Sequence, residues 1–321
     1  MLSRRHLRIK VLQALYAFLL SVNDRLDLGE KELFRSLDKL YEIYIYQLSL
    51  LIEIIEFARK RIEENKQKFF PTEDDLDPNT RFVENSFIHQ IETNRELLRK
   101  IDLYKISWYD SEDLIRKLLV TIRESDEFKE YMQDAKPTYE KDKEIFFRIV
   151  KKYISRSELL QFYYEERSIY WYDDFNVANL LVLKTIKSYK ESWDEFHKFP
   201  EFFKNEGDEV INEDKQFVKD LFRKTIIHSD EYNNIIEEKV KNWEMDRIAV
   251  MDILLIKMAM VELMEMPSIP IKVTLNEYIE LAKLYSTPKS KIFVNGILDK
   301  LIVDLKNQNR IKKVGRGLME N

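Results

Sequence analysis

The 321-residue sequence contains no cysteine and only five glycines. Without cysteine the chain forms no disulfide, thiolate nucleophile or cysteine-ligated zinc or iron–sulfur site. Phosphate-binding loops need clustered glycines for their backbone geometry, and here glycines approach one another only at Gly315 and Gly317 near the end of the sequence. Nucleotide-binding α/β folds are therefore not expected.

Long apolar runs are also missing. No run of about 18 apolar residues occurs, so no membrane-spanning helix is expected. The opening MLSRRHLRIK lacks a small-residue cleavage site, and we interpret it as a mature helix. A cytoplasmic protein fits these absences. With seven prolines and 35% charged residues the chain is expected to be all-α, and its length predicts about two domains.

Positive charge gathers at the two ends of the chain, although the net charge is −5. Four basic residues and no acid occupy the first ten positions. The segment from Lys283 to Arg316 contains nine basic residues and only two acidic ones, Asp299 and Asp304, so its net charge is +7. The remainder is acidic, so any contact with nucleic acid is expected at the ends.

Apolar periodicity predicts a chain of helices joined by short breaks. Pro71 and Pro78 mark a loop over 69–80, and 199–209 is the best candidate linker. Thr274 and Glu277 have the spacing of a capping box, and Thr287-Pro288 has that of an N-cap followed by proline. The predicted helices are 3–22, 30–66, 81–101, 110–134, 139–153, 156–170, 174–196, 213–227, 230–242, 245–265 and 288–306.

Two basic clusters are candidate RNA contacts. Lys289 and Lys291 stand at a predicted helix start, where cations are disfavoured by the helix dipole unless an anion binds. The alternative interpretation is a solvated charged turn. Arg4, Arg5 and Arg8 lie on the first helix, and arginine pairs well with phosphate.

Tyr16, further along the first helix, could stack an unpaired base. The alternative there is a basic helix end with a core tyrosine. The four histidines are scattered, and no catalytic motif occurs. We therefore expect no enzymatic activity, no cofactor and no metal.

Several motifs resemble the NusB family. They are RRHLRIKVLQALYA (4–17), WEMDRIAVMDILLIKMAMVEL (243–263), NEYIELAK (276–283) and FVNGILDK (293–300). The resemblance implies two packed helical bundles that bind boxA RNA together with NusE, a small-subunit ribosomal protein. It also implies association with elongating RNA polymerase and antitermination in ribosomal RNA operons, without catalysis.

The resemblance also assigns residues. Arg4, Arg5 and Arg8 match the family's arginine-rich RNA-binding motif, and Tyr16 matches the aromatic of its QALY segment. The segment that approaches RNA contains Lys289, Lys291 and Phe293, and the acids implied to face NusE are Asp246 and Asp252.

The sequence departs from the family pattern mainly by a long helical, acidic insertion over about 30–205. We expect an N-terminal bundle over 1–242 that contains the insertion, a C-terminal bundle over 243–306 and a basic flexible tail over 307–321. We interpret the insertion as a protein-contact surface, because acidic residues repel phosphate.

Two alternatives remain open. One is a helical protein-interaction scaffold without RNA affinity of its own. The other is an RNA-modifying enzyme, because NusB-like domains also occur fused to RNA cytosine methyltransferases; it would need a catalytic cysteine, which this chain lacks. The RNA-binding interpretation itself predicts that the N-terminal helix and the turn at Thr287 meet in a shared groove.

Overall fold

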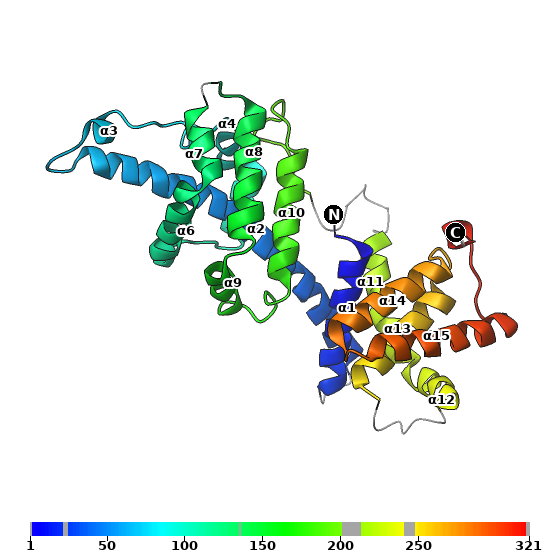
Figure 1. Cartoon of the computed structure of the whole chain (residues 1–321). Helices are drawn as coiled ribbons and strands as arrows, with labels where there is room; N and C mark the ends of the chain where they lie inside the picture. The colour runs from blue at the N-terminus through cyan, green and yellow to red at the C-terminus, as the bar shows by residue number, and fades with distance from the viewer. Residues whose placement is uncertain (1, 22–24, 135, 201–212, 241–247, 319–321) are drawn as a thin grey trace. The chain divides into compact units, whose positions relative to one another are not determined.

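A computed structural model of the protein describes residues 2–21, 25–134, 136–200, 213–240 and 248–318. All regular secondary structure within these ranges is helical (Figure 1), which confirms the predicted all-α class. None of the helices in these ranges is long and apolar enough to cross a membrane.

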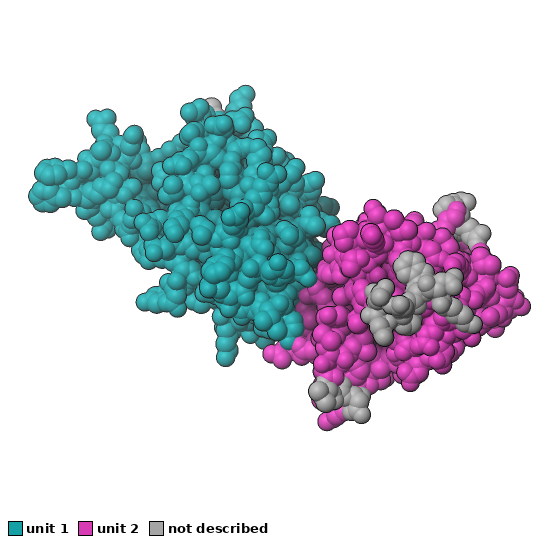
Figure 2. Space-filling view, turned by 60° about the horizontal axis from the view of Figure 1, so that its bottom comes forward, with its two compact units in different colours: residues 1, 37–202 teal, residues 2–36, 203–321 magenta. Residues whose placement is uncertain are grey.

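The chain folds into two compact units, coloured separately in Figure 2. Unit 1 consists of residue 1 and residues 37–202, and unit 2 consists of residues 2–36 and 203–321. Unit 1 coincides with most of the segment expected as an insertion. The N-terminal helix and the C-terminal helices belong together in unit 2, so both basic ends of the chain are in the same unit.

Unit 2 is built around one apolar helix, α13 (Val250–Glu265), which falls within the predicted helix 245–265. Eleven residues of α13 are buried, including every residue from Leu254 to Leu263. The helices that pack against it are α1 (Arg4–Leu20), α11 (Glu213–Ile227), α12 (Ser229–Lys239), α14 (Ile271–Tyr285) and α15 (Ser290–Asn307).

Local chemistry fixes the start of α1. The Ser3 hydroxyl accepts a hydrogen bond from the His6 amide and so caps the helix. From there Leu7, Val11 and Leu15 recur along one face, and all three are buried. This apolar stripe is the one that the spacing in the sequence predicts.

The predicted capping box at Thr274 is wrong. Helix α14 begins at Ile271, directly after Pro270, so Thr274 lies within the helix rather than at its start. Its buried hydroxyl contacts Glu262, at 3.3 Å, and the Pro270 carbonyl, at 3.4 Å. Pro270, the residue before the helix, has the extended backbone of an N-cap residue. Glu277 therefore does not cap α14 and pairs with Arg5 instead.

The second predicted helix start is also displaced. Helix α15 begins at Ser290, and its N-cap residue, Lys289, makes no side-chain capping bond. Thr287 instead accepts the Ser290 amide through its carbonyl, at 2.9 Å, and exchanges a hydroxyl hydrogen bond with Ser290 at 2.8 Å. The turn is thus closed by Ser290 rather than by Thr287 and Pro288.

Unit 1 begins within the long helix α2 (Leu26–Lys66) and is completed by shorter helices. They are α3 (Glu73–Leu76), α4 (Ser86–Glu92), α5 (Arg95–Leu103), α6 (Glu112–Glu124), α7 (Asp126–Gln133), α8 (Tyr139–Ile149), α9 (Glu158–Glu165) and α10 (Asp174–Ser188), with short 3₁₀ and π turns at Tyr109–Ser111 and Val150–Ile154.

Several of these helices are shorter than the periodicity predicts. The expected helix over 81–101 is divided because Asn94 accepts the Leu97 amide and starts α5. The expected helix over 110–134 is divided because Ser125 caps α7. Asparagine and serine favour such caps over helix interiors, and apolar spacing does not reveal that choice.

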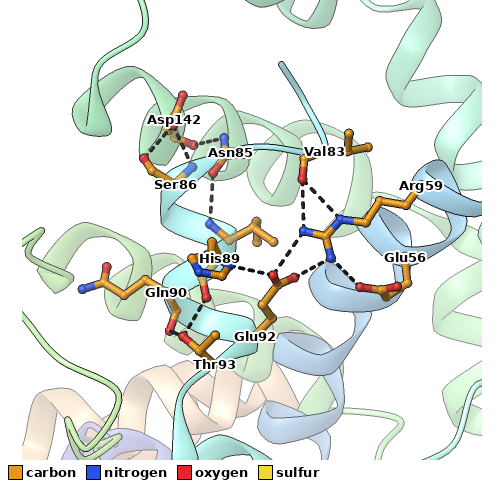
Figure 3. A network of polar contacts seen from close by, with 11 residues as sticks. Glu56, Arg59, Val83, Asn85, Ser86, His89, Gln90, Glu92, Thr93 and Asp142 are labelled. Atoms are coloured by element: carbon orange, nitrogen blue, oxygen red, sulfur yellow. Dashed lines mark hydrogen bonds and ion pairs between the residues drawn. The ribbon is translucent and has the colours of Figure 1, made fainter. Parts of the chain in front are cut away.

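A polar network joins α2, α4 and α8 inside unit 1 (Figure 3). Arg59 donates to both carboxylate oxygens of Glu92, at 2.9 and 3.1 Å, and to the Val83 carbonyl. Nearby, the Asp142 carboxylate accepts from the amide and hydroxyl of Ser86, at 2.9 and 2.6 Å. These bonds hold the start and the end of α4 against its neighbours.

Candidate nucleic-acid interface

A hollow of about 1450 Å³ lies at the N-terminal end of α1. Its wall comes from α1, α11, the turn between α13 and α14, the first half of α14 and the C-terminal tail. The charged residues that line it are Arg4, Arg5, His6, Arg8, Glu213, Asp220, Glu265, Glu277 and Arg316. The hollow therefore carries charge of both signs.

Arg4 lies at the rim and is half-buried. Its Nε is 2.7 Å from the Asp214 carboxylate, and its guanidinium lies 4.5 Å from the centre of the Phe217 ring. The ion pair is partly exposed, and pairs of that kind contribute little to stability. The Phe217 ring also holds the Arg4 guanidinium in place. Phe217 lies in the predicted helix 213–227, but apolar spacing alone does not reveal its contact with Arg4.

Arg5 is held by a carboxylate in a two-pronged contact. Its Nε and Nη2 donate to Glu277 on α14 at 2.9 and 2.7 Å. This hydrogen bonding lowers the pKa of Glu277 and raises that of Arg5, so both groups stay charged. The contact ties α1 to α14 and leaves one edge of the guanidinium toward solvent, since the Arg5 side chain is 43% exposed.

Arg8 does not lie on the surface that Arg4 and Arg5 share. The residue is 2% exposed, and its Nε and Nη2 donate to Glu262 at 2.6 and 2.8 Å. Burial alone would lower the pKa of Arg8. The hydrogen bonds to Glu262 and the negative charge of that residue outweigh burial, so the pKa of Arg8 is raised. The expectation of an exposed Arg8 is corrected, since its partner on α13 draws it into the core.

Tyr16 lies on the same side of α1 as Arg5. It follows Arg5 by eleven residues, which is close to three turns and about 16 Å along the helix. Tyr16 is 36% exposed, so part of its ring can be reached from solvent. A cation and an accessible aromatic thus share one face of this helix.

Lys289, Lys291 and Phe293 surround the start of α15. Both lysines are exposed, and neither makes an ion pair with any residue that the structure describes. Lys289 and the half-buried Phe293 line a second hollow, of about 530 Å³, whose lining is mostly apolar. Unlike the arginines of α1, these lysines carry uncompensated charge.

Asp252 lines the second hollow but is 5% exposed. Its Oδ2 accepts a hydrogen bond from the Ser290 hydroxyl at 2.7 Å, whereas its Oδ1 has no hydrogen-bond partner within the described part of the chain. The carboxylate therefore fixes the start of α15. Asp246 lies outside the described residues.

The arginines of α1 line the first hollow of unit 2 and Lys289 lines the second, and the two hollows share no lining residue among those described. They are linked through α14, because Arg5 binds Glu277 and the chain then runs eight residues to Tyr285, a rise of about 12 Å. The structure thus replaces the expected single groove with two basic sites of one unit.

Comparison with known proteins identifies a family. The family model described as the NusB family matches residues 176–303. The chain is 46% identical over 105 residues to the transcription antitermination protein NusB of Salinibacter ruber, covering 33% of this chain and 66% of that protein.

Two further curated relatives carry the same name. The chain is 38% identical over 106 residues to the protein of Chloroherpeton thalassium, covering 33% of this chain and 50% of the relative. It is 37% identical over 113 residues to that of Finegoldia magna, covering 35% of this chain and 77% of the relative. No solved structure matches.

Proposed function

The chain belongs to the NusB family, and on that premise we propose that it is a non-enzymatic, RNA-binding transcription antitermination factor. Its ligand is single-stranded boxA-type RNA, bound together with NusE. The complex acts with the RNA polymerase elongation complex and supports ribosomal RNA transcription.

The observation that supports this proposal most directly is the placement of both basic ends of the chain in unit 2. Lys289 and Lys291 offer charge that no described acid compensates. Arg4 and Arg5 are partly exposed, and each is oriented by a carboxylate whose side chain is 17% or 18% exposed. In the proposal, a phosphate replaces that carboxylate. Such contacts release counterions from the RNA and make its affinity dependent on salt.

Aromatic side chains give the site a preference for unpaired bases. Tyr16 is accessible on the face of Arg5, and Phe293 lies beside the two lysines. Stacking of one base on such a ring contributes about 1–3 kcal/mol and needs no particular sequence. A single strand offers its bases for stacking, whereas a duplex does not.

Arg8 supports RNA binding indirectly in this proposal. Its guanidinium is taken up by Glu262, so it anchors α1 and sets the position of Arg4 and Arg5 one turn earlier. Replacing it would move the other two arginines rather than remove one phosphate contact.

We propose that NusE contacts Asp252 and Ile292 of the second hollow, whereas the RNA contacts Lys289 and Phe293 of the same hollow. Asp252 holds the start of α15 there, and the exposed Ile292 (71%) adds apolar surface beside it. Apolar contact around a small number of polar groups is the usual composition of a protein interface. Asp246 remains part of the proposal on the family resemblance alone. The acidic insertion supplies a further protein-contact surface in unit 1.

A helical scaffold without RNA affinity is the second candidate. The observation that favours it is the pairing of Arg4 and Arg5 with acids, since a neutralised arginine attracts RNA less strongly. Capture of ribosomal or polymerase proteins by a chain that binds no RNA, alone or with NusE, would support this candidate.

The test is a titration of fluorescein-labelled boxA-type RNA with the full chain, with and without NusE. The variant is Arg4→Gln/Arg5→Gln. Its charge-matched control is Arg116→Gln/Arg123→Gln on α6 of unit 1. We expect salt-sensitive binding that NusE strengthens, that the first variant weakens about tenfold and that the control leaves unchanged. Equal affinities of the parent and the first variant at every salt concentration would contradict the assignment.

A further inference from the structure

The end of the chain folds back onto unit 2. In Figure 1 the red C-terminal segment leaves the end of α15 and turns back. The Val314 amide donates to the Pro267 carbonyl at 3.0 Å. Lys313 Nζ donates to the Glu262 and Met266 carbonyls, at 2.9 and 3.0 Å, and so satisfies acceptors at the C-terminal end of α13. Composition alone did not predict these contacts.

Two glycines allow this close approach. Gly315 has a φ of +52°, a conformation that other residues adopt with strain. Gly317 is buried, and a Cβ added there would lie 1.9 Å from the Pro267 carbonyl oxygen. Any side chain at Gly317 therefore displaces either the tail or the turn between α13 and α14.

Docking of the tail brings Arg316 into the wall of the first hollow, which Arg4 and Arg5 also line. Arg316 is exposed, and it makes no ion pair within the described ranges. Arg4, Arg5 and Arg8 each have a carboxylate partner. Of the four arginines around this hollow, Arg316 is thus the one whose charge is not already offset by a described acid.

We propose that the docked tail forms part of the RNA-binding site and that Arg316 contacts a phosphate of the strand bound at Arg4 and Arg5. This inference rests on the proposed RNA-binding function. It follows from charge and placement together. A phosphate at Arg4 or Arg5 displaces a carboxylate, whereas a phosphate at Arg316 displaces none, and Lys313 and Gly317 hold Arg316 where that strand passes.

The first test compares Arg316→Gln with Lys312→Gln, using the full chain and boxA-type single-stranded RNA over a range of salt concentrations. Lys312 is an exposed cation of the same tail that does not line the hollow. Each lost contact to a single strand lowers the slope of log affinity against log salt by about 0.7. We expect that decrease for Arg316→Gln and an unchanged slope for Lys312→Gln.

The second test adds Gly317→Val, which displaces the tail without removing a charge. We expect it to weaken RNA binding as much as Arg316→Gln does, and the double variant to bind no more weakly than either. Circular dichroism of all three variants should match the parent, because the tail adds little helix. Additive losses in the double variant would contradict a role for docking.

The outcomes separate the two proposals. A parent that binds RNA, with equal slopes for Arg316→Gln and Lys312→Gln, overturns the role of the tail and leaves the proposed function standing. A parent that binds no RNA, with or without NusE, overturns the proposed function and the role of the tail with it.

Discussion

Arg8 on α1 and Glu262 on α13 form a buried two-pronged ion pair, with Nε to Oε1 at 2.6 Å and Nη2 to Oε2 at 2.8 Å. The two residues are 254 positions apart in the chain. Glu262 also accepts the Tyr278 hydroxyl of α14 at 2.8 Å. One carboxylate thus ties together the helix that carries the arginines, the central helix and the helix that leads to the turn at Thr287.

Glu262→Gln should destabilise unit 2 strongly. Without Glu262 the buried Arg8 keeps only the longer contact with Glu277, at 3.7 Å, and breaking a buried ion pair in this way costs about 3–5 kcal/mol. Urea denaturation followed by circular dichroism measures the loss. The control is Glu280→Gln, which breaks the exposed pair with Lys283 and should cost less than about 1 kcal/mol. Equal costs for the two variants would show that Glu262 does not anchor α1.

The sequence predicts the helices of unit 2 well, because each helix has one apolar face. The stripe of Leu7, Val11 and Leu15 and the nearly continuous apolar surface of α13 have the periods expected of packed helices. The class of fold and the family follow from such patterns and from the motifs around NEYIELAK and FVNGILDK.

The polar details do not follow from local sequence. Arg4 and Arg8 are both arginines of the same basic cluster, and nothing in the local sequence tells them apart. Arg8 is buried because it pairs with Glu262, which is distant in the chain. Thr274 and Glu277 have capping spacing, yet Pro270 starts the helix one turn earlier. The docking of the tail depends on Pro267 and Met266, about 50 residues upstream of Lys313. Long-range partners decide each of these cases.

Asp252→Asn should weaken the interaction with NusE about tenfold and leave binding of RNA alone unchanged. Asp252 lines the apolar hollow, and its Oδ1 has no hydrogen-bond partner in the described part of the chain, so the amide of Asn would put a donor where the partner meets an acceptor. Ser290→Ala is the matched control, because it breaks the same hydrogen bond but keeps the carboxylate. Calorimetric titration with NusE measures both variants. A loss of the same size for Ser290→Ala would mean that Asp252 acts only by positioning α15.

Docking of the tail should strengthen as pH rises. Burial lowers the pKa of Lys313 to about 8, against an ordinary value of 10.5 in the undocked tail. Between these values the undocked state binds more protons, so deprotonation favours the docked state increasingly from pH 8 to 10.5. The free energy of unfolding of the parent relative to Lys313→Met should rise over that window and stay constant below it. A difference independent of pH would contradict the buried position of Lys313.

The central claim is that Arg4 and Arg5, together with Lys289 and Lys291, bind one RNA strand. The most direct measurement is the slope of log affinity against log salt for the parent, Arg4→Gln/Arg5→Gln, Lys289→Gln/Lys291→Gln and the fourfold variant. With about 0.7 per phosphate contact, each double variant should lower the slope by about 1.4 and the fourfold variant by about 2.8. An unchanged slope in either double variant would contradict the claim, because that pair would then not touch the RNA.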